Sequence, residues 1–195
     1  MEIINIGVAG CLGKMGRELV KKVIENPKVN LTGGFEHKGH KLINKNLSEI
    51  INCETNLIVS NSAEEVFLNS NVVIDFTTPE SSLVNIEFAQ KTKTPLVIGT
   101  TGLSLEINKK IIDASNQVAL LQSTNMSLGV NLLFDLVKKT ASLLDDINYD
   151  IEIAETHHKH KIDAPSGTAL TLGEFVSKGR KRNFEDIKVY ERANK

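Results

Sequence analysis

Cysteine is scarce in this chain of 195 residues, which contains only Cys11 and Cys53. Neither cysteine has another cysteine or a histidine close by in the sequence. Two isolated cysteines indicate a protein of a reducing compartment rather than a disulfide-bonded one.

Net charge and long apolar runs are scarce as well. Lys and Arg number 23 against 24 Asp and Glu, so the formal net charge is -1. Such a balance gives no global field that would attract nucleic acid or a membrane surface. No apolar run approaches the length of a membrane span, and the N-terminus lacks the regions of a signal peptide. We therefore predict a cytoplasmic protein with no nucleic-acid or membrane partner.

Short apolar runs alternate with helical patterns in the N-terminal part of the chain. Unbroken apolar runs are typical of strands buried on both faces, as in a parallel sheet covered by helices. We predict strands at residues 3–9, 29–35, 72–76, 96–98 and 118–121, and helices at residues 17–25, 79–91 and 104–115. This alternation implies right-handed crossovers, so the predicted fold is α/β, a Rossmann-type doubly wound parallel sheet.

The pattern changes after Asn125. We predict a dinucleotide-binding domain over residues 1–125 and a substrate-binding, catalytic domain over residues 126–195. In the second domain a helical stripe is formed by Leu133, Leu136, Val137, Ala141 and Leu144. Residues 149–154 and 187–190 resemble strands, and residues 165–177 resemble a helix opened by Pro165 or Ser166. The second domain is therefore expected to be an α+β substrate and oligomerisation domain.

The segment after the first predicted strand has glycines in the spacing G-x-x-G-x-x-G, at Gly10, Gly13 and Gly16. The first glycine permits a tight turn, the second lets the backbone approach a pyrophosphate, and the third lets helix and strand pack closely. Free N–H groups at the start of the next helix favour the anion. Glu36 ends the second predicted strand, where an acidic ribose ligand is expected. We predict a dinucleotide site; the alternative is a glycine-rich turn that binds nothing.

Two further loops follow predicted strands at the same edge of the sheet. One contains Phe76 and Thr77, and the other contains Gly99, Thr100 and Thr101. Ligands of open α/β sheets bind outside the carboxyl ends of the strands, so these loops suit the ribose and nicotinamide groups. Ordinary turn chemistry is the alternative, because Gly, Thr and Pro are common in loops.

The most unusual segment of the chain contains His157, His158, Lys159, His160 and Lys161. Imidazole exchanges protons near neutral pH, and a lysine beside other cations becomes a better acid. Directly afterwards a helix opens, and its N–H groups and hydroxyls form a second anion site at Ser166, Gly167 and Thr168. Two anion sites and a proton donor favour the reduction of a small dicarboxylate by hydride transfer.

Two alternatives apply to this segment. His157, His158 and His160 could bind zinc, although the adjacent lysines repel a dication and no cysteine joins them. The segment could also be a solvated basic turn, as most charge runs are. The ordered entry into a helix at Pro165 and Ser166 argues against a simple turn, and we predict no metal.

Together these segments resemble the 4-hydroxy-tetrahydrodipicolinate reductase family, also called dihydrodipicolinate reductase. The resemblance runs from Ile4 to Leu172 and is most specific over residues 155–170, which read ETHHKHKIDAPSGTAL. It implies an oxidoreductase that uses NADH or NADPH to reduce 4-hydroxy-tetrahydrodipicolinate to tetrahydrodipicolinate, in diaminopimelate and lysine biosynthesis. It also implies a cytoplasmic homotetramer in the full-length form.

The resemblance implies roles for individual residues. His157 resembles the family's proton donor or acceptor, and Lys161 resembles its catalytic proton donor. Contacts with the substrate carboxylates are expected from His158, Gly167 and Thr168, beside Ser166. With the loops above, cofactor contacts are predicted for Gly10, Cys11, Leu12, Gly13, Lys14, Met15, Gly16, Glu36, His37, Phe76, Thr77, Gly99, Thr100, Thr101, Ser123, Thr124, Asn125 and Met126.

One departure from the family concerns length. The family continues through further strands and a final helix, so we expect the second domain to be truncated at Lys195. Two other functions are weighed. A Rossmann dehydrogenase of an aspartate-derived semialdehyde is disfavoured by the His-His-x-x-Lys and Pro-Ser-Gly-Thr elements, and a cofactor-binding sensor would show no turnover.

Overall fold

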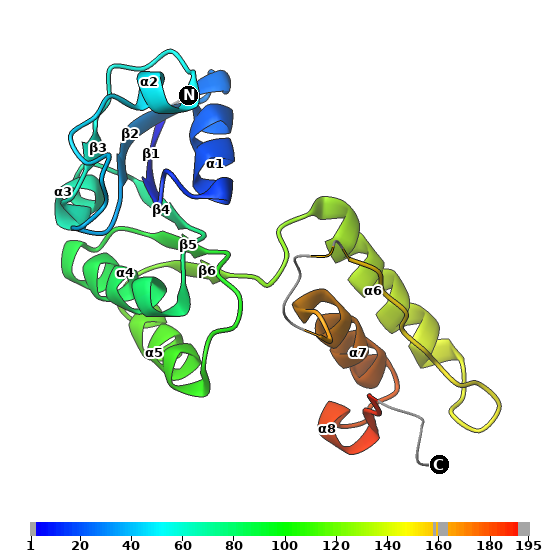
Figure 1. The fold of residues 1–195 in the computed structure, drawn as a ribbon. Coiled ribbons are helices and arrows are strands. Elements are labelled where there is room, and N and C mark those ends of the chain that lie inside the picture. Colours follow the sequence, from blue (N-terminus) through cyan, green and yellow to red (C-terminus); the bar gives the residue numbers. More distant parts are fainter. Residues whose placement is uncertain (1–2, 158, 160–163, 191–195) are drawn as a thin grey trace. The chain divides into compact units, whose positions relative to one another are not determined.

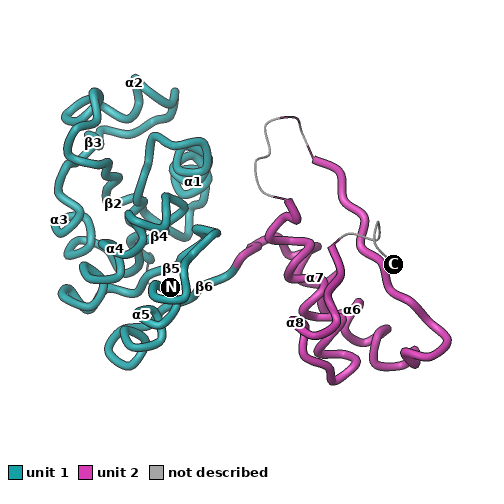
Figure 2. The backbone as a smooth tube through the Cα atoms, turned by 60° about the horizontal axis from the view of Figure 1, so that its bottom comes forward, with its two compact units in different colours: residues 1–123 teal, residues 124–195 magenta. Residues whose placement is uncertain are grey.

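The computed structural model describes residues 3–157, 159 and 164–190 of the chain. The chain divides into two units, Met1–Ser123 and Thr124–Lys195, which are coloured separately in Figure 2. Among the described residues, strands occur only in the first unit. The segments predicted to bind the cofactor lie mainly in the first unit, and those predicted to bind the substrate and to transfer a proton lie in the second.

The first unit contains one parallel sheet with the strand order β3–β2–β1–β4–β5–β6 (Figure 1). The chain begins near the centre with β1, passes outward through β2 and β3, and then crosses to β4 on the other side of β1. The change in direction falls between β1 and β4, which confirms the predicted doubly wound sheet. The strands are β1 Ile4–Ala9, β2 Val29–Phe35, β3 Val59–Ser60, β4 Val72–Asp75, β5 Leu96–Ile98 and β6 Leu120–Gln122.

Helices cover both faces of this sheet. Val8 of β1 belongs to the apolar cluster that contains α1 and α2, whereas its neighbour Ala9 belongs to the cluster that contains α3, α4 and α5. Successive strand residues point to opposite faces, so the two clusters are two separate core layers. The helices are α1 Lys14–Glu25, α2 Leu47–Ile51, α3 Ala63–Leu68, α4 Pro79–Thr92 and α5 Leu105–Ser115.

Side-chain caps define where most of these helices begin. The Thr78 hydroxyl accepts from the N–H of Ser81 at the start of α4, and Pro79 occupies the first turn. α1 begins differently, because its cap is Gly13, which offers no side chain, and its first turn has no acidic residue. The N-terminus of α1 is therefore open to an external anion.

The second unit consists of three helices among its described residues, α6 Leu128–Leu143, α7 Gly167–Gly179 and α8 Phe184–Ile187. α6 and α7 pack together through the stacked rings of Phe134 and Phe175, whose centroids are 5.2 Å apart. Ala141 of the predicted stripe is buried, whereas Leu133 and Leu136 are about half exposed.

Two predictions of strands are wrong, and some predicted bounds differ from the observed ones; α1, for example, begins at Lys14 and not at residue 17. Residues 149–154 form no strand, because no neighbouring strand pairs with them among the described residues. Residues 187–190 form none either, since Ile187 ends α8 and the N–H of Lys188 closes that helix on the carbonyl of Phe184. β6 starts at Leu120 instead of residue 118, because the N–H of Val118 is bound to Ala114 at the end of α5. The expected sheet of the second unit is thus not present in its described residues.

Candidate functional site

The glycine loop joins β1 to α1 at the carboxyl edge of the sheet. Gly10 has a φ of 61°, the left-handed conformation that a tight turn uses. A Cβ on Gly16 would lie 2.0 Å from the Gly10 carbonyl oxygen, so only glycine allows the helix to sit this close to the loop. The Gly13 N–H donates to that same oxygen at 3.0 Å. The first-turn amides of α1, which no helix carbonyl can reach, face outward and suit a pyrophosphate.

Glu36 follows β2 and is held against the glycine loop. Its Oε1 accepts from the backbone N–H of Leu12 at 2.9 Å. The carboxylate therefore lies beside the predicted pyrophosphate position, and its remaining lone pairs are available to ribose hydroxyls.

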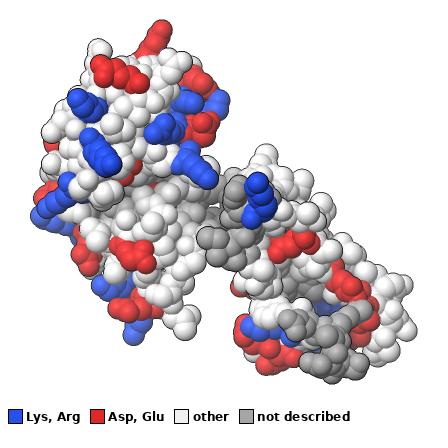
Figure 3. Space-filling model, viewed as in Figure 1, with Lys and Arg blue, Asp and Glu red and all other residues white. Residues whose placement is uncertain are grey.

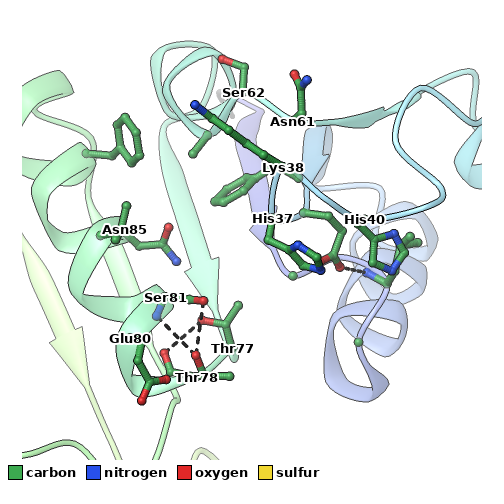
Figure 4. Close-up of a pocket in the computed structure, with 18 of the residues that line it drawn as sticks. His37, Lys38, His40, Asn61, Ser62, Thr77, Thr78, Glu80, Ser81 and Asn85 are labelled. Carbon is green, nitrogen blue, oxygen red and sulfur yellow. Dashed lines mark hydrogen bonds between the residues drawn. The ribbon is translucent and has the colours of Figure 1, made fainter.

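A cavity of about 1140 Å³ opens at this edge. Figure 4 shows His37 and His40 side by side on one wall, with Thr77, Thr78 and Ser81 across from them. The two imidazole rings meet edge to face, with centroids 5.5 Å apart. The volume slightly exceeds the usual range of about 300–1,000 Å³ for small-molecule sites, so the cavity is large enough for the adenosine half of a dinucleotide.

Several lining residues were not predicted from the sequence. They include His40, Asn61, Ser62, Ser81 and Asn85. His40 carried a usable signal, because it follows His37 and Lys38 closely in the chain. Of the others, Asn61 and Ser62 precede α3, and Ser81 and Asn85 lie on α4, so only the crossovers bring them to the cavity.

The loops after β4 and β5 meet each other. The ring of Phe76 lies over Gly99, where an added Cβ would be 2.1 Å from the ring carbon Cζ. The Thr100 side chain is buried, and its Oγ1 is hydrogen-bonded within the protein. Thr101 is exposed, and Gly102 has a φ of 73°. A ligand can thus meet the backbone of this loop and Thr101, but not the Thr100 hydroxyl.

The predicted contacts within the glycine loop differ in what they expose. Cys11 is fully buried and faces Gly34 of β2, so only its backbone can reach a ligand. Leu12 is 7% exposed, whereas Met15 is 48% exposed. Lys14 is also exposed, at the first position of α1. The loop therefore presents backbone amides and the side chains of its helix end.

Cys11 is expected to be chemically inert. Burial, and then the nearby Glu36 carboxylate, raise the pKa of the Cys11 thiol to about 12. Because the thiolate is the reactive form and exists only above that pKa, Cys11 stays protonated near neutral pH. We expect an alkylating reagent at about pH 8 to label the partly buried Cys53 and to spare Cys11 in the folded protein, as read by peptide mass spectrometry. Equal labelling of both thiols in folded protein would contradict the burial of Cys11.

The segment Ser123, Thr124, Asn125 and Met126 lies at the division between the two units. The Ser123 N–H donates to the Ile98 carbonyl at 3.1 Å, which extends the β5–β6 ladder. Thr124 and Thr171 share a hydrogen bond between their hydroxyls at 3.2 Å. The Asn125 side chain accepts from the N–H of Ser127, which caps α6. Met126 is 40% exposed.

In the second unit, Glu155 connects the histidine segment to the start of α7. Its Oε1 accepts from the Ser166 N–H at 2.8 Å, and its Oε2 accepts from the Ser166 hydroxyl. The Nδ1 of His157 lies 3.7 Å from the same Oε2. Ser166 is 2% exposed and caps α7, so its own polar groups are already used. The backbone N–H groups of Gly167 and Thr168 lie in the first turn of α7 and can bind an anion.

Three residues with predicted or alternative roles lie outside the described residues: His158, Lys161 and the alternative zinc ligand His160. Among the residues that the structure does describe, no group of three or more His, Cys, Asp or Glu side chains could hold a metal ion. The described part of the chain likewise has no helix long and apolar enough to cross a lipid bilayer.

Acidic and basic side chains occur together on the visible face of each unit (Figure 3). The binding features are instead local: an open helix N-terminus, an acid at the end of β2, and loops at the switch in strand order. Together they define the first unit as a Rossmann-type, NAD(P)-binding domain.

The chain belongs to the dihydrodipicolinate reductase family. The profile of the family's N-terminal part matches residues 4–126, and that of its C-terminal part matches residues 129–193. The 4-hydroxy-tetrahydrodipicolinate reductase of Polynucleobacter necessarius is 37% identical over 97% of this chain and 71% of its own length. The protein of the same name from Wolbachia pipientis of Culex pipiens is 44% identical, over 93% of this chain and 69% of its own length.

A solved structure resembles the whole chain. The dipicolinate-bound dihydrodipicolinate reductase from Paenisporosarcina has a TM-score of 0.73 and 26% identity, and the match covers 100% of this chain and 71% of that one. The WlbA dehydrogenase of Bordetella pertussis, with a TM-score of 0.55 and 13% identity, shares the fold alone.

Proposed function

We propose that this chain catalyses the NADH- or NADPH-dependent reduction of 4-hydroxy-tetrahydrodipicolinate to tetrahydrodipicolinate, in diaminopimelate and lysine biosynthesis. The observation that carries the proposal is that both units match the same reductase family. The glycine loop, the open N-terminus of α1 and Glu36 support the binding of the dinucleotide. The first-turn amides of α7 support the binding of a dicarboxylate.

The residues of the second unit act on the substrate in this proposal. The bound nicotinamide supplies a hydride. Thr168 and Gly167 hold a substrate carboxylate at the N-terminus of α7, with His158 as a further contact. The 4-hydroxyl group of the substrate leaves as water together with a ring hydrogen, and the unsaturated ring so formed accepts the hydride. Lys161 donates the proton that neutralises the charge left by hydride addition, and His157 is the second candidate donor. Glu155 fixes both ends of the segment, because it contacts Ser166 and lies beside His157.

The cellular setting and assembly are also proposals. The Paenisporosarcina reductase structure has dipicolinate, a dicarboxylate, bound to that protein. The same class of small dicarboxylate fits the anion site at α7. We propose a cytoplasmic enzyme that forms a homotetramer and has no nucleic-acid or membrane partner.

We predict that both reduced cofactors are used, with a modest preference for NADH. The Glu36 carboxylate accepts from ribose hydroxyls, which favours NADH, while His37 and Lys38 at the same cavity offset the charge of a 2′-phosphate. Dissociation constants for NADH and NADPH, measured side by side, check this. Lys38→Ala should weaken NADPH alone, and Lys41→Ala, at an exposed lysine outside the cavity lining, serves as the control. A large preference for NADPH in the unaltered chain would contradict the prediction.

The loss of nicotinamide absorbance tests the reaction itself. We expect oxidation of NADH in the presence of the product of dihydrodipicolinate synthase, and none with aspartate semialdehyde. Oxidation with the semialdehyde would indicate a different dehydrogenase, and binding without oxidation would indicate a sensor.

A further inference from the structure

Asp75 is a fully buried carboxylate at the last position of β4. Its Oδ1 accepts from the Thr77 N–H at 2.9 Å, from the Thr77 hydroxyl at 2.6 Å and from the Thr100 hydroxyl at 3.3 Å. Its Oδ2 accepts from the Asn85 side-chain amide at 3.0 Å. One carboxylate therefore joins the loop after β4, the loop after β5 and helix α4.

Thr100 is the second centre of the same network. Its Oγ1 accepts from the Ser82 hydroxyl at 2.9 Å, and the N–H of Thr77 is shared between this oxygen, at 3.0 Å, and Asp75. Ser82 is itself fully buried on α4. A displacement of either loop would leave buried donors without acceptors, which is costly, so the network holds the two loops in one arrangement.

The core alone does not require a carboxylate at this position. Val73, two residues earlier on the same strand, is also fully buried and packs in the core through an apolar side chain. A buried carboxylate is expensive unless it is fully hydrogen-bonded, and the side-chain partners of Asp75 lie on the two loops and on the helix that begins between them. This indicates that the role of the Asp75 carboxylate is to hold the two loops in place.

The strand order places these loops relative to a bound dinucleotide. Glu36 follows β2, on one side of β1, and marks the adenosine half. β4 and β5 lie on the other side of β1, across the switch in strand order. The loop after β4 lines the cavity assigned to the adenosine half, beside Glu36 and His37. The loop after β5 lies one strand farther from β2 and belongs to the half of the site that would hold the nicotinamide ribose and ring.

We propose that Asp75 is a positioning residue that fixes the loop after β5, which meets the nicotinamide half of the cofactor, against the loop after β4. The proposal rests on the dinucleotide binding proposed above. Asp75 touches no cofactor atom; it acts through Thr77 and through the backbone around Thr100.

The experiment compares two ligands that differ by the nicotinamide, NADH and ADP-ribose, on the Asp75→Asn variant. An asparagine would place an NH2 donor against either the Asn85 amide or the donors of Thr77 and Thr100. We expect the dissociation constant for NADH to rise by about tenfold or more, while that for ADP-ribose rises by less than about threefold. Asp113→Asn, at an exposed aspartate on α5, is the matched control and should leave both constants unchanged.

Ser82→Ala provides a milder second variant, because it removes only one donor to Thr100. Its dissociation constant for NADH should rise by about threefold, with a smaller change for ADP-ribose. If circular dichroism shows that Asp75→Asn is unfolded, Ser82→Ala decides the question. Equal losses for both ligands, or none in a folded variant, would overturn the positioning role alone. Failure of the unaltered chain to bind NADH and NADPH would overturn the proposed function and this role together.

Discussion

Lys161→Ala is expected to lower kcat for 4-hydroxy-tetrahydrodipicolinate by at least about a hundredfold, while the affinity for NADH stays close to that of the unaltered chain. The reason is chemical: hydride addition to an electron-poor substrate leaves negative charge that a positioned acid must neutralise. His157→Ala should lower kcat to a similar extent. Thr168→Ala should instead raise KM, because this residue is proposed to anchor the substrate.

Steady-state kinetics with separate kcat and KM values measure these effects. Lys159→Ala is the matched control, since Lys159 is an exposed cation in the same segment with no proposed role in proton transfer. If Lys161→Ala keeps a near-normal kcat and loses only substrate affinity, Lys161 is an electrostatic anchor. The proton would then come from His157 or water.

Gly16→Ala is expected to abolish detectable NADH binding and to lower the free energy of unfolding by about 1–3 kcal/mol. The added Cβ would lie 2.0 Å from the Gly10 carbonyl oxygen and 2.9 Å from the Cys11 Cα. These are backbone atoms that cannot rotate away, so α1 must move off the loop and the pyrophosphate site is lost. NADH titration and urea unfolding measure the two effects.

Gly129→Ala makes the same chemical change at a helix position where the nearest atom is 3.9 Å from the added Cβ. Within α6, alanine should stabilise by roughly 0.5–1 kcal/mol and leave NADH binding unaltered. A Gly16→Ala protein that binds NADH and unfolds like the unaltered chain would show that the close approach of helix and loop is unnecessary.

The sequence predicted the parts of the fold that have strong local patterns. β2 and β5 have the bounds expected from their apolar runs, and α4 begins at Pro79 behind a threonine cap. The elements between Glu36 and Val72 were not predicted, because β3 has two residues and α2 has five, too few for a periodic signal. Residues 149–154 have an alternating pattern but no described pairing partner, and a strand exists only when it is paired.

The same distinction applies to the candidate site. Gly10 and Glu36 were predictable because their roles follow from position relative to adjacent elements. The network around Asp75 was not, since Asp75 and Thr100 are 25 residues apart and only the β4–β5 pairing brings them together. The contact between Glu155 and Ser166 was missed for a similar reason, because it spans a segment with no periodic pattern.

Transfer of the hydride itself is the most direct measurement of the proposed reaction. The cofactor would be NADH deuterated at both C4 positions of the dihydronicotinamide ring, and the substrate would be 4-hydroxy-tetrahydrodipicolinate made by dihydrodipicolinate synthase. The account predicts cofactor oxidation only when this substrate is present, and tetrahydrodipicolinate that carries one deuterium by mass spectrometry. Tetrahydrodipicolinate without deuterium, or cofactor oxidation that does not depend on the substrate, would contradict it.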